Sequence, residues 1–219
     1  MIIMENIKTG KERQEAYKTE YQRYKIAMKY KFYLEAVAIC YAANEDRLTA
    51  FLHHAGIVTR TNENLCINSK VYPYIRRLLN KDENGNVKVK DISVKMAIVQ
   101  ELLTMTEERA QEIDESVSEY IKGIKRKGSV ARSGYMTDLF HKVQKVHREE
   151  VLDTLTKLDS WRDERNKLIH ALLNKTVSSA IDTKKNCADN GYKISRNLDD
   201  HLVKPFKKAN TLRKKYNIQ

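Results

Sequence analysis

The chain has 219 residues, a charged fraction of 32% and a formal net charge of +12 at pH 7. This length supports one substantial hydrophobic core, while the composition excludes a disordered chain, and no apolar run of about 18 residues is present to span a membrane. Seven glycines and two prolines are few, and because sheets and irregular loops use both in turns, their scarcity predicts an all-α fold.

The charge and the cysteines indicate the partners and the compartment. An excess of 41 basic over 29 acidic residues creates a field that attracts phosphate polymers. Cys40, Cys66 and Cys187 form no CxxC pair and have no zinc-site spacing, so we expect reduced thiols in a cytoplasmic protein, with Cys40 in the core. The six histidines belong to no metal-binding array, and we expect neither a metal nor a cofactor.

The N-terminal half predicts helices followed by an irregular segment. Residues 11–54 are expected to be helical, either continuous or broken once, with Gly56 as the stop signal. Tyr30, Tyr33 and Tyr41 are interpreted as packing residues rather than base-stacking platforms. Residues 57–90 are the least regular part, and the Asn84-Gly85 pair there allows a small hairpin.

The C-terminal half predicts two long helices and two basic segments. One helix is expected from Asp91, with Asp91 or Ser93 as its N-cap, to about Lys122, and another from about Thr137 to Asn174. Between them lies a basic loop, and a polar helical segment follows from Thr176. These two segments supply candidate contacts to a phosphate polymer, namely Lys125, Arg126, Lys127 and Arg132 in the loop and Lys207, Lys208, Arg213, Lys214 and Lys215 in the extension. A solvated helix face is the alternative for the extension.

The segment 155–174 contains an unusual arginine. At about 100° per residue, its apolar residues form one stripe, and Arg165 falls near the centre of that stripe. A guanidinium keeps its charge, so inside a core it needs a carboxylate or an interface. Glu45, on an apolar face of the N-terminal helix, is a candidate to orient Arg165 by a charge-assisted hydrogen bond, with Glu35 or Asp46 as substitutes. The alternative for Glu45 is a carboxylate reaching solvent from the helix flank.

The hexapeptide Arg165-Asn166-Lys167-Leu168-Ile169-His170 resembles the Arg–polar–x–x–x–His motif of HEPN domains. These helical domains include metal-independent RNases of toxin–antitoxin, abortive-infection and RNA-guided CRISPR systems. The resemblance covers residues 20–175 in outline and extends to a long amphipathic helix that carries the motif. It implies a HEPN-like helical domain over 1–175, with 57–90 as an insertion, and a basic helical extension over 176–219.

The resemblance also implies roles for individual residues. His170 would act as general acid or base in attack of the RNA 2′-hydroxyl on the adjacent phosphate, because histidine exchanges protons near neutral pH. Arg165 would bind the scissile phosphate, Asn166 would orient His170 or hold a phosphate oxygen, and Arg162 would add an RNA contact. HEPN nucleases pair two motifs, so the single motif here implies a site completed in a homodimer.

The resemblance places such an endoribonuclease in phage defence or in growth arrest, where an antitoxin or a guide RNA could restrain it. Two other functions remain open from the residues. The chain could be a HEPN-like module that binds RNA or a protein without cleaving it. It could also be an unrelated basic helical scaffold in which Arg165 is a paired core residue.

Overall fold

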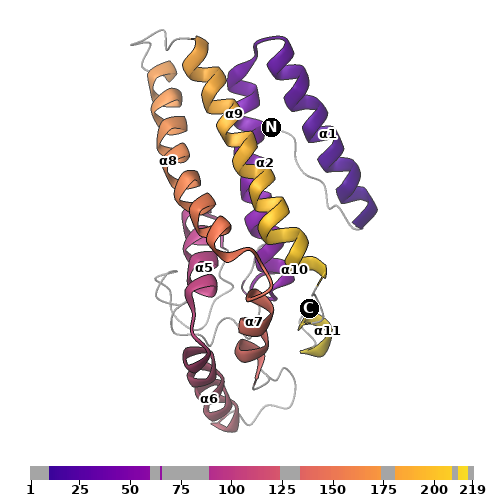
Figure 1. Cartoon of the computed structure of the whole chain (residues 1–219), viewed down its shortest axis with the longest axis vertical. Helices are drawn as coiled ribbons and strands as arrows, with labels where there is room; N and C mark the ends of the chain where they lie inside the picture. The colour runs from indigo at the N-terminus through magenta and orange to yellow at the C-terminus, as the bar shows by residue number, and fades with distance from the viewer. Residues whose placement is uncertain are drawn as a thin grey trace. The chain divides into compact units, whose positions relative to one another are not determined.

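The computed structural model describes residues 10–59, 65, 89–123, 134–173, 181–208 and 212–216. Over these ranges the chain is almost entirely helical, and its one β-type contact is an isolated bridge between Val58 and Leu65. The all-α prediction is therefore confirmed (Figure 1). The elements are α1 (Gly10–Lys29), α2 (Tyr33–His54), α5 (Ile92–Thr104), α6 (Glu107–Gly123), α7 (Tyr135–Val143), α8 (Arg148–Leu173), α9 (Ile181–Asn197), the π-helix η1 (Leu198–Val203), α10 (Lys204–Lys208) and α11 (Leu212–Lys215).

Two of the predicted features lie outside the described residues. The hairpin expected at Asn84-Gly85 is one, and the basic loop expected at 125–134 is the other, apart from Gly134. No helix within the described ranges combines the length and the apolar character that crossing a bilayer requires.

The chain divides into two compact units that each combine separate stretches of sequence. Unit 1 comprises Met1–Asn44 and Thr156–Arg196, and unit 2 comprises Glu45–Leu155 and Asn197–Gln219. Helix α9, which the sequence assigned to a C-terminal extension, thus belongs to the same unit as the segment that carries Arg165.

The N-terminal helical region is broken once, which is one of the two arrangements that we expected for residues 11–54. Helix α1 ends in a Schellman motif, in which Phe32 N–H donates to Ala27 C=O at 2.8 Å and Lys31 N–H to Met28 C=O at 3.2 Å. The motif requires a left-handed residue at its penultimate position. Here Lys31 takes that conformation with φ 61°, where glycine is the usual choice.

The predicted stop at Gly56 is confirmed. Helix α2 ends at His54, and Gly56 has φ 81°. Its N–H donates to His53 C=O at 2.9 Å, while Ile57 N–H donates to Leu52 C=O at 2.9 Å. This is again a Schellman motif, and glycine there adopts the left-handed conformation without a Cβ penalty.

The helix expected from Asp91 to about Lys122 is wrong in its continuity. It starts as predicted, with Asp91 at the N-cap of α5, but Met105 is extended with ψ 142° and ends that helix. Thr106 then caps α6, since its hydroxyl oxygen accepts a hydrogen bond from Arg109 N–H at 3.2 Å. A threonine N-cap followed directly by acidic residues is the local sequence signal for the start of a second helix.

The single helix expected from Thr137 to Asn174 is also wrong, because α7 ends at Val143 and α8 begins at Arg148. A carboxylate from another helix fixes the start of α7. Asp114 of α6 accepts hydrogen bonds from the backbone N–H groups of Met136 and Thr137, both at 2.9 Å, and from the Thr137 hydroxyl at 2.7 Å. Such groups at a helix N-terminus otherwise lack partners.

Candidate functional site

The helices around the motif are held together by an unusually close contact in unit 1. Gly191 of α9 lies against Trp161 of α8 and Cys40 of α2, and there is no room for a Cβ at this position. The Trp161 indole donates to the Cys187 carbonyl at 2.7 Å, and the Asn44 amide donates to the Gly191 carbonyl at 3.3 Å. The contacts of α8 with α9 and α2 therefore fix the orientation of the α8 face that carries Arg165.

Cys40 and Cys187 take part in this contact, and both thiols are poor nucleophiles near neutral pH. Cys40 is buried, as predicted, and its Sγ donates to the Ala188 carbonyl at 3.4 Å. Burial, with the neighbouring Cys187 and Asp189, raises the pKa of Cys40 to about 12. Burial and the charge of Glu164 raise the pKa of Cys187 to about 11. Because the thiolate is the nucleophile, neither group suits covalent catalysis near neutral pH.

Alkylation of the native protein should therefore spare both thiols. A brief iodoacetamide pulse at pH 8, followed by peptide mass mapping, is expected to leave Cys40 and Cys187 unmodified, whereas the same pulse in guanidinium labels them. Raised pKa values keep the thiols protonated, so labelling of the native protein stays slow as the pH rises to 10. Native labelling at the rate of a free thiol would contradict this account.

Arg165 is half-buried and lies over an aromatic ring. Its guanidinium carbon is 4.5 Å from the centroid of the Tyr41 ring, a cation–π distance. Its Nη1 donates to Asn166 Oδ1 at 2.9 Å, and its buried Nε has no hydrogen-bond partner among the described residues. Within the same residues, no carboxylate lies at ion-pair distance from Arg165. Among the described residues, a ring and an amide thus orient the guanidinium, and no anion offsets its charge.

His170 lies in the last turn of α8 and is exposed. It makes no hydrogen bond or ion pair with another residue that the structure describes. Five residues separate it from Arg165, which places the two side chains about 140° apart around the helix. Asn166 is also exposed, and its side chain holds Arg165 rather than His170. One copy of α8 therefore presents the two groups in different directions.

Other predicted site residues have partners of their own. The cation that binds Glu45 in the structure is Lys95, whose ammonium lies 2.9 Å from the carboxylate and is almost fully buried. Arg162 pairs with Asp159 at 2.8 Å. Neither Glu45 nor Arg162 is thus seen in the role that the sequence suggested, because each is bound to a different residue.

Lys215, one of the candidate contacts in the basic C-terminal segment, is also bound to an acid. The Lys215 ammonium binds Asp138, and the Tyr216 hydroxyl donates to the same carboxylate at 2.6 Å. Burial alone would raise the pKa of Asp138, but these two hydrogen bonds and the nearby lysine charges lower it below its ordinary value. Lys215 thus anchors α11 to α7, and its charge is already offset before any RNA binds.

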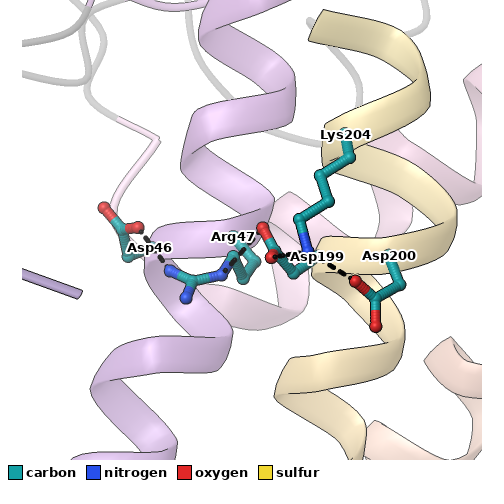
Figure 2. Close-up of polar contacts among 5 residues, drawn as sticks. All are labelled: Asp46, Arg47, Asp199, Asp200 and Lys204. Carbon is teal, nitrogen blue, oxygen red and sulfur yellow. Dashed lines mark hydrogen bonds and ion pairs between the residues drawn. The ribbon is translucent and has the colours of Figure 1, made fainter. Parts of the chain in front are cut away.

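Lys204 is engaged in a similar way, in a charge network of unit 2 (Figure 2). Its ammonium lies 3.0 Å from Asp199 and 2.6 Å from Asp200, which raises its pKa. Arg47 lies 3.5 Å from Asp199 and 3.1 Å from Asp46. Each of the two cations in this network thus lies close to two carboxylates.

The side chains of the remaining candidate RNA contacts lie outside the described residues. Lys207 and Lys208 lie in α10, and Arg213 and Lys214 lie in α11, with side chains outside the described residues. The loop cations Lys125, Arg126, Lys127 and Arg132 are outside them entirely. Among the described residues, no three His, Cys, Asp or Glu side chains come together as a metal would require.

No family model, curated protein or solved structure matches this chain. The residues of α2, α8 and α9 around Arg165 are therefore the basis on which a function is proposed.

Proposed function

We propose that this protein is a metal-independent endoribonuclease whose active site is formed by Arg165 and His170 of two protomers. The observation that carries the proposal is the state of Arg165, which is oriented by Tyr41 and Asn166 yet has no carboxylate partner among the described residues. By contrast, Arg162, Lys204 and Lys215 are all paired with acids. A rigid, uncompensated guanidinium suits a phosphate ligand.

The chemistry follows from the two side-chain types. His170 takes the proton of the RNA 2′-hydroxyl, the 2′-oxygen attacks the adjacent phosphorus, and the bond to the 5′-oxygen breaks. The leaving 5′-oxygen receives a proton from water, and the products are a 2′,3′-cyclic phosphate and a 5′-hydroxyl. Arg165 stabilises the charge that develops on the phosphate oxygens in the transition state.

A second copy of the chain would bring the two groups together. Since Arg165 and His170 diverge on one helix, a single α8 does not surround a phosphate with both. A twofold axis beside this helix would place Arg165 of one protomer near His170 of the other, so a dimer would hold two such Arg165–His170 pairs. The exposure of His170 and Asn166 is compatible with such an approach.

A role in phage defence or growth arrest rests on the resemblance of the motif to HEPN nucleases. A regulatory antitoxin or a structured guide RNA belongs to the same proposal. Neither is needed for the chemistry, which concerns the phosphodiester alone.

Cleavage of a mixed-sequence RNA by the purified protein in EDTA tests the proposed function. We expect fragments that end in 2′,3′-cyclic phosphate, and no cleavage of the same sequence made as DNA, which lacks the nucleophilic 2′-hydroxyl. Fragments with a 3′-hydroxyl, or activity that EDTA abolishes, would contradict the mechanism. An inert protein that binds RNA with strong salt dependence would instead identify a binding module.

A further inference from the structure

Unit 1 contains an open pocket that the motif does not use. It has a volume of about 430 Å³ and is lined by residues 31–35 on one side and by Ile181 and Lys184 of α9 on the other. In Figure 1 the turn between α1 and α2 and the first turn of α9 lie at the same end of the unit as the last turn of α8. That last turn carries His170, so the pocket and the proposed catalytic group share one end of the unit.

Large apolar side chains are exposed in this pocket and directly beside it. The lining residues Phe32 and Ile181 are 59% and 63% exposed, and Tyr30, which precedes the lining residue Lys31 in the chain, is 59% exposed. The interpretation of Tyr30 as a packing residue is therefore wrong, whereas Tyr33 is buried as expected. The Tyr30 and Phe32 rings lie 6.3 Å apart with an interplanar angle of 29°. Exposed, neighbouring rings are unusual on a plain solvated turn and indicate a binding surface.

The turn that presents these rings is held in a strained conformation. Lys31 lies between them with φ 61°, and the two hydrogen bonds of the Schellman motif fix the backbone on both sides. A non-glycine residue is disfavoured in this region because its Cβ comes too close to the neighbouring carbonyl oxygen. A glycine would relieve that strain but would remove an ammonium group from the pocket.

The charge of the pocket is positive. Lys31 and Lys184 line it, and among the described residues neither has an ion-pair partner. Its one acidic lining residue, Glu35, is bound by Arg23 at 3.3 Å. Rings combined with unpaired lysines match a ligand that has flat aromatic faces and phosphates.

We propose that this pocket is a base-stacking site for single-stranded RNA, in which Phe32 and Tyr30 hold a base and Lys31 and Lys184 bind its phosphates. The choice of RNA rests on the proposed function, and the site would hold the strand beside the phosphate to be cut. A second copy of this chain is the other candidate occupant. Charge repulsion disfavours this occupant, because a second copy would bring two more lysines to the surface that already carries Lys31 and Lys184.

Binding of a fluorescent, 2′-O-methylated 12-mer to the full-length protein tests the site without cleavage. Phe32→Ala is expected to weaken binding about tenfold, in the range found for loss of one stacked base. Phe32→Leu should lose most of that affinity too, because it keeps an apolar side chain without a π face. Tyr21→Ala is the matched control, since Tyr21 is an exposed ring of α1 that does not line the pocket.

Lys31→Gly separates a binding role from a structural one. Relief of the left-handed strain should raise the melting temperature, while loss of the ammonium should weaken RNA binding and lower the salt dependence by about one phosphate contact. A more stable variant that binds as the wild type does would show that Lys31 only shapes the turn, and would remove it from the site.

The outcomes distinguish this site from the proposed nuclease. If the wild type cuts RNA and Phe32→Ala binds unchanged, the pocket proposal fails alone. If the wild type is inert as a nuclease but its binding depends on Phe32, the pocket stands and the catalytic proposal fails. Failure of the wild type to bind the 12-mer overturns the site, and so does an effect of Phe32→Ala that is confined to the oligomeric state, which would identify a second copy as the occupant.

Discussion

His170→Ala is expected to slow RNA cleavage by about 100- to 10,000-fold, the range typical of a lost general acid or base. The melting temperature should not change, because the side chain is exposed and makes no hydrogen bond or ion pair with other described residues. Lys167→Ala, on the same helix and also exposed, is the matched control. Single-turnover cleavage and thermal unfolding measure the two effects separately.

Substitution of Arg165 is expected to change both RNA cleavage and stability, unlike substitution of His170. Arg165→Ala removes the phosphate ligand and also the contact with Tyr41, so it should lower both cleavage and stability. Arg165→Lys retains the charge but loses the planar donor set, and we expect most of the activity to be lost in this variant as well. If both His170→Ala and Arg165→Ala cleaved as the wild type does, the motif would be a coincidence of sequence.

A mixture of the two inactive variants tests whether the site is shared. In a mixed dimer, the Arg165→Ala protomer still supplies His170 and the His170→Ala protomer still supplies Arg165, so one complete pair remains. Dimers carrying two different affinity tags should therefore cleave faster than either parent variant. Mixed dimers as slow as the parents would place both groups of each site in one protomer.

The helical architecture could be predicted because its signals are local. Few glycines and prolines indicated long helices, and Gly56 marked a helix end that the structure confirms. The errors lie at the breaks after α5 and α7, where no glycine or proline marks an end. A Thr106 cap starts α6, and directly before α8 the His147 N–H donates to the His201 carbonyl at 3.2 Å. The second of these signals exists only after folding has brought His147 and His201 together.

In the candidate site, too, features set by the local sequence could be predicted, whereas contacts between helices could not. Helical spacing places Arg165 on an apolar face, and the sequence offered either a carboxylate, with Glu45 as the candidate, or an interface as its partner. The structure gives it Tyr41 and Asn166, and it gives Glu45 to Lys95. Tyr41 already belonged to the apolar face of the N-terminal helix, and a ring is a favourable partner for a guanidinium. Which side chain faces Arg165 depends on the rotation of two helices, and spacing along one of them does not define it.

Gly191→Ala is expected to destabilise the protein by about 2 kcal/mol, against the direction that helix propensity predicts. Alanine in place of glycine inside a helix normally stabilises by up to about 1 kcal/mol. Here an added Cβ would lie 2.5 Å from Trp161 Cζ2 and 2.8 Å from Cys40 Cβ. The indole is held by its hydrogen bond to the Cys187 carbonyl, so α8 or α9 must shift, and such overpacking costs about 1–3 kcal/mol or more.

Urea unfolding of a double-mutant cycle identifies the cause. Trp161→Phe removes the ring atom nearest the new Cβ, so Gly191→Ala should cost at least about 1 kcal/mol less in that background, because contacting residues do not behave additively. Lys193→Ala, at an exposed position of α9, should be nearly neutral. Stabilisation by Gly191→Ala would show that α8 and α9 are farther apart than the structure has them. Because Arg165 is one helical turn from Trp161, that result would also remove the basis for placing its guanidinium over Tyr41.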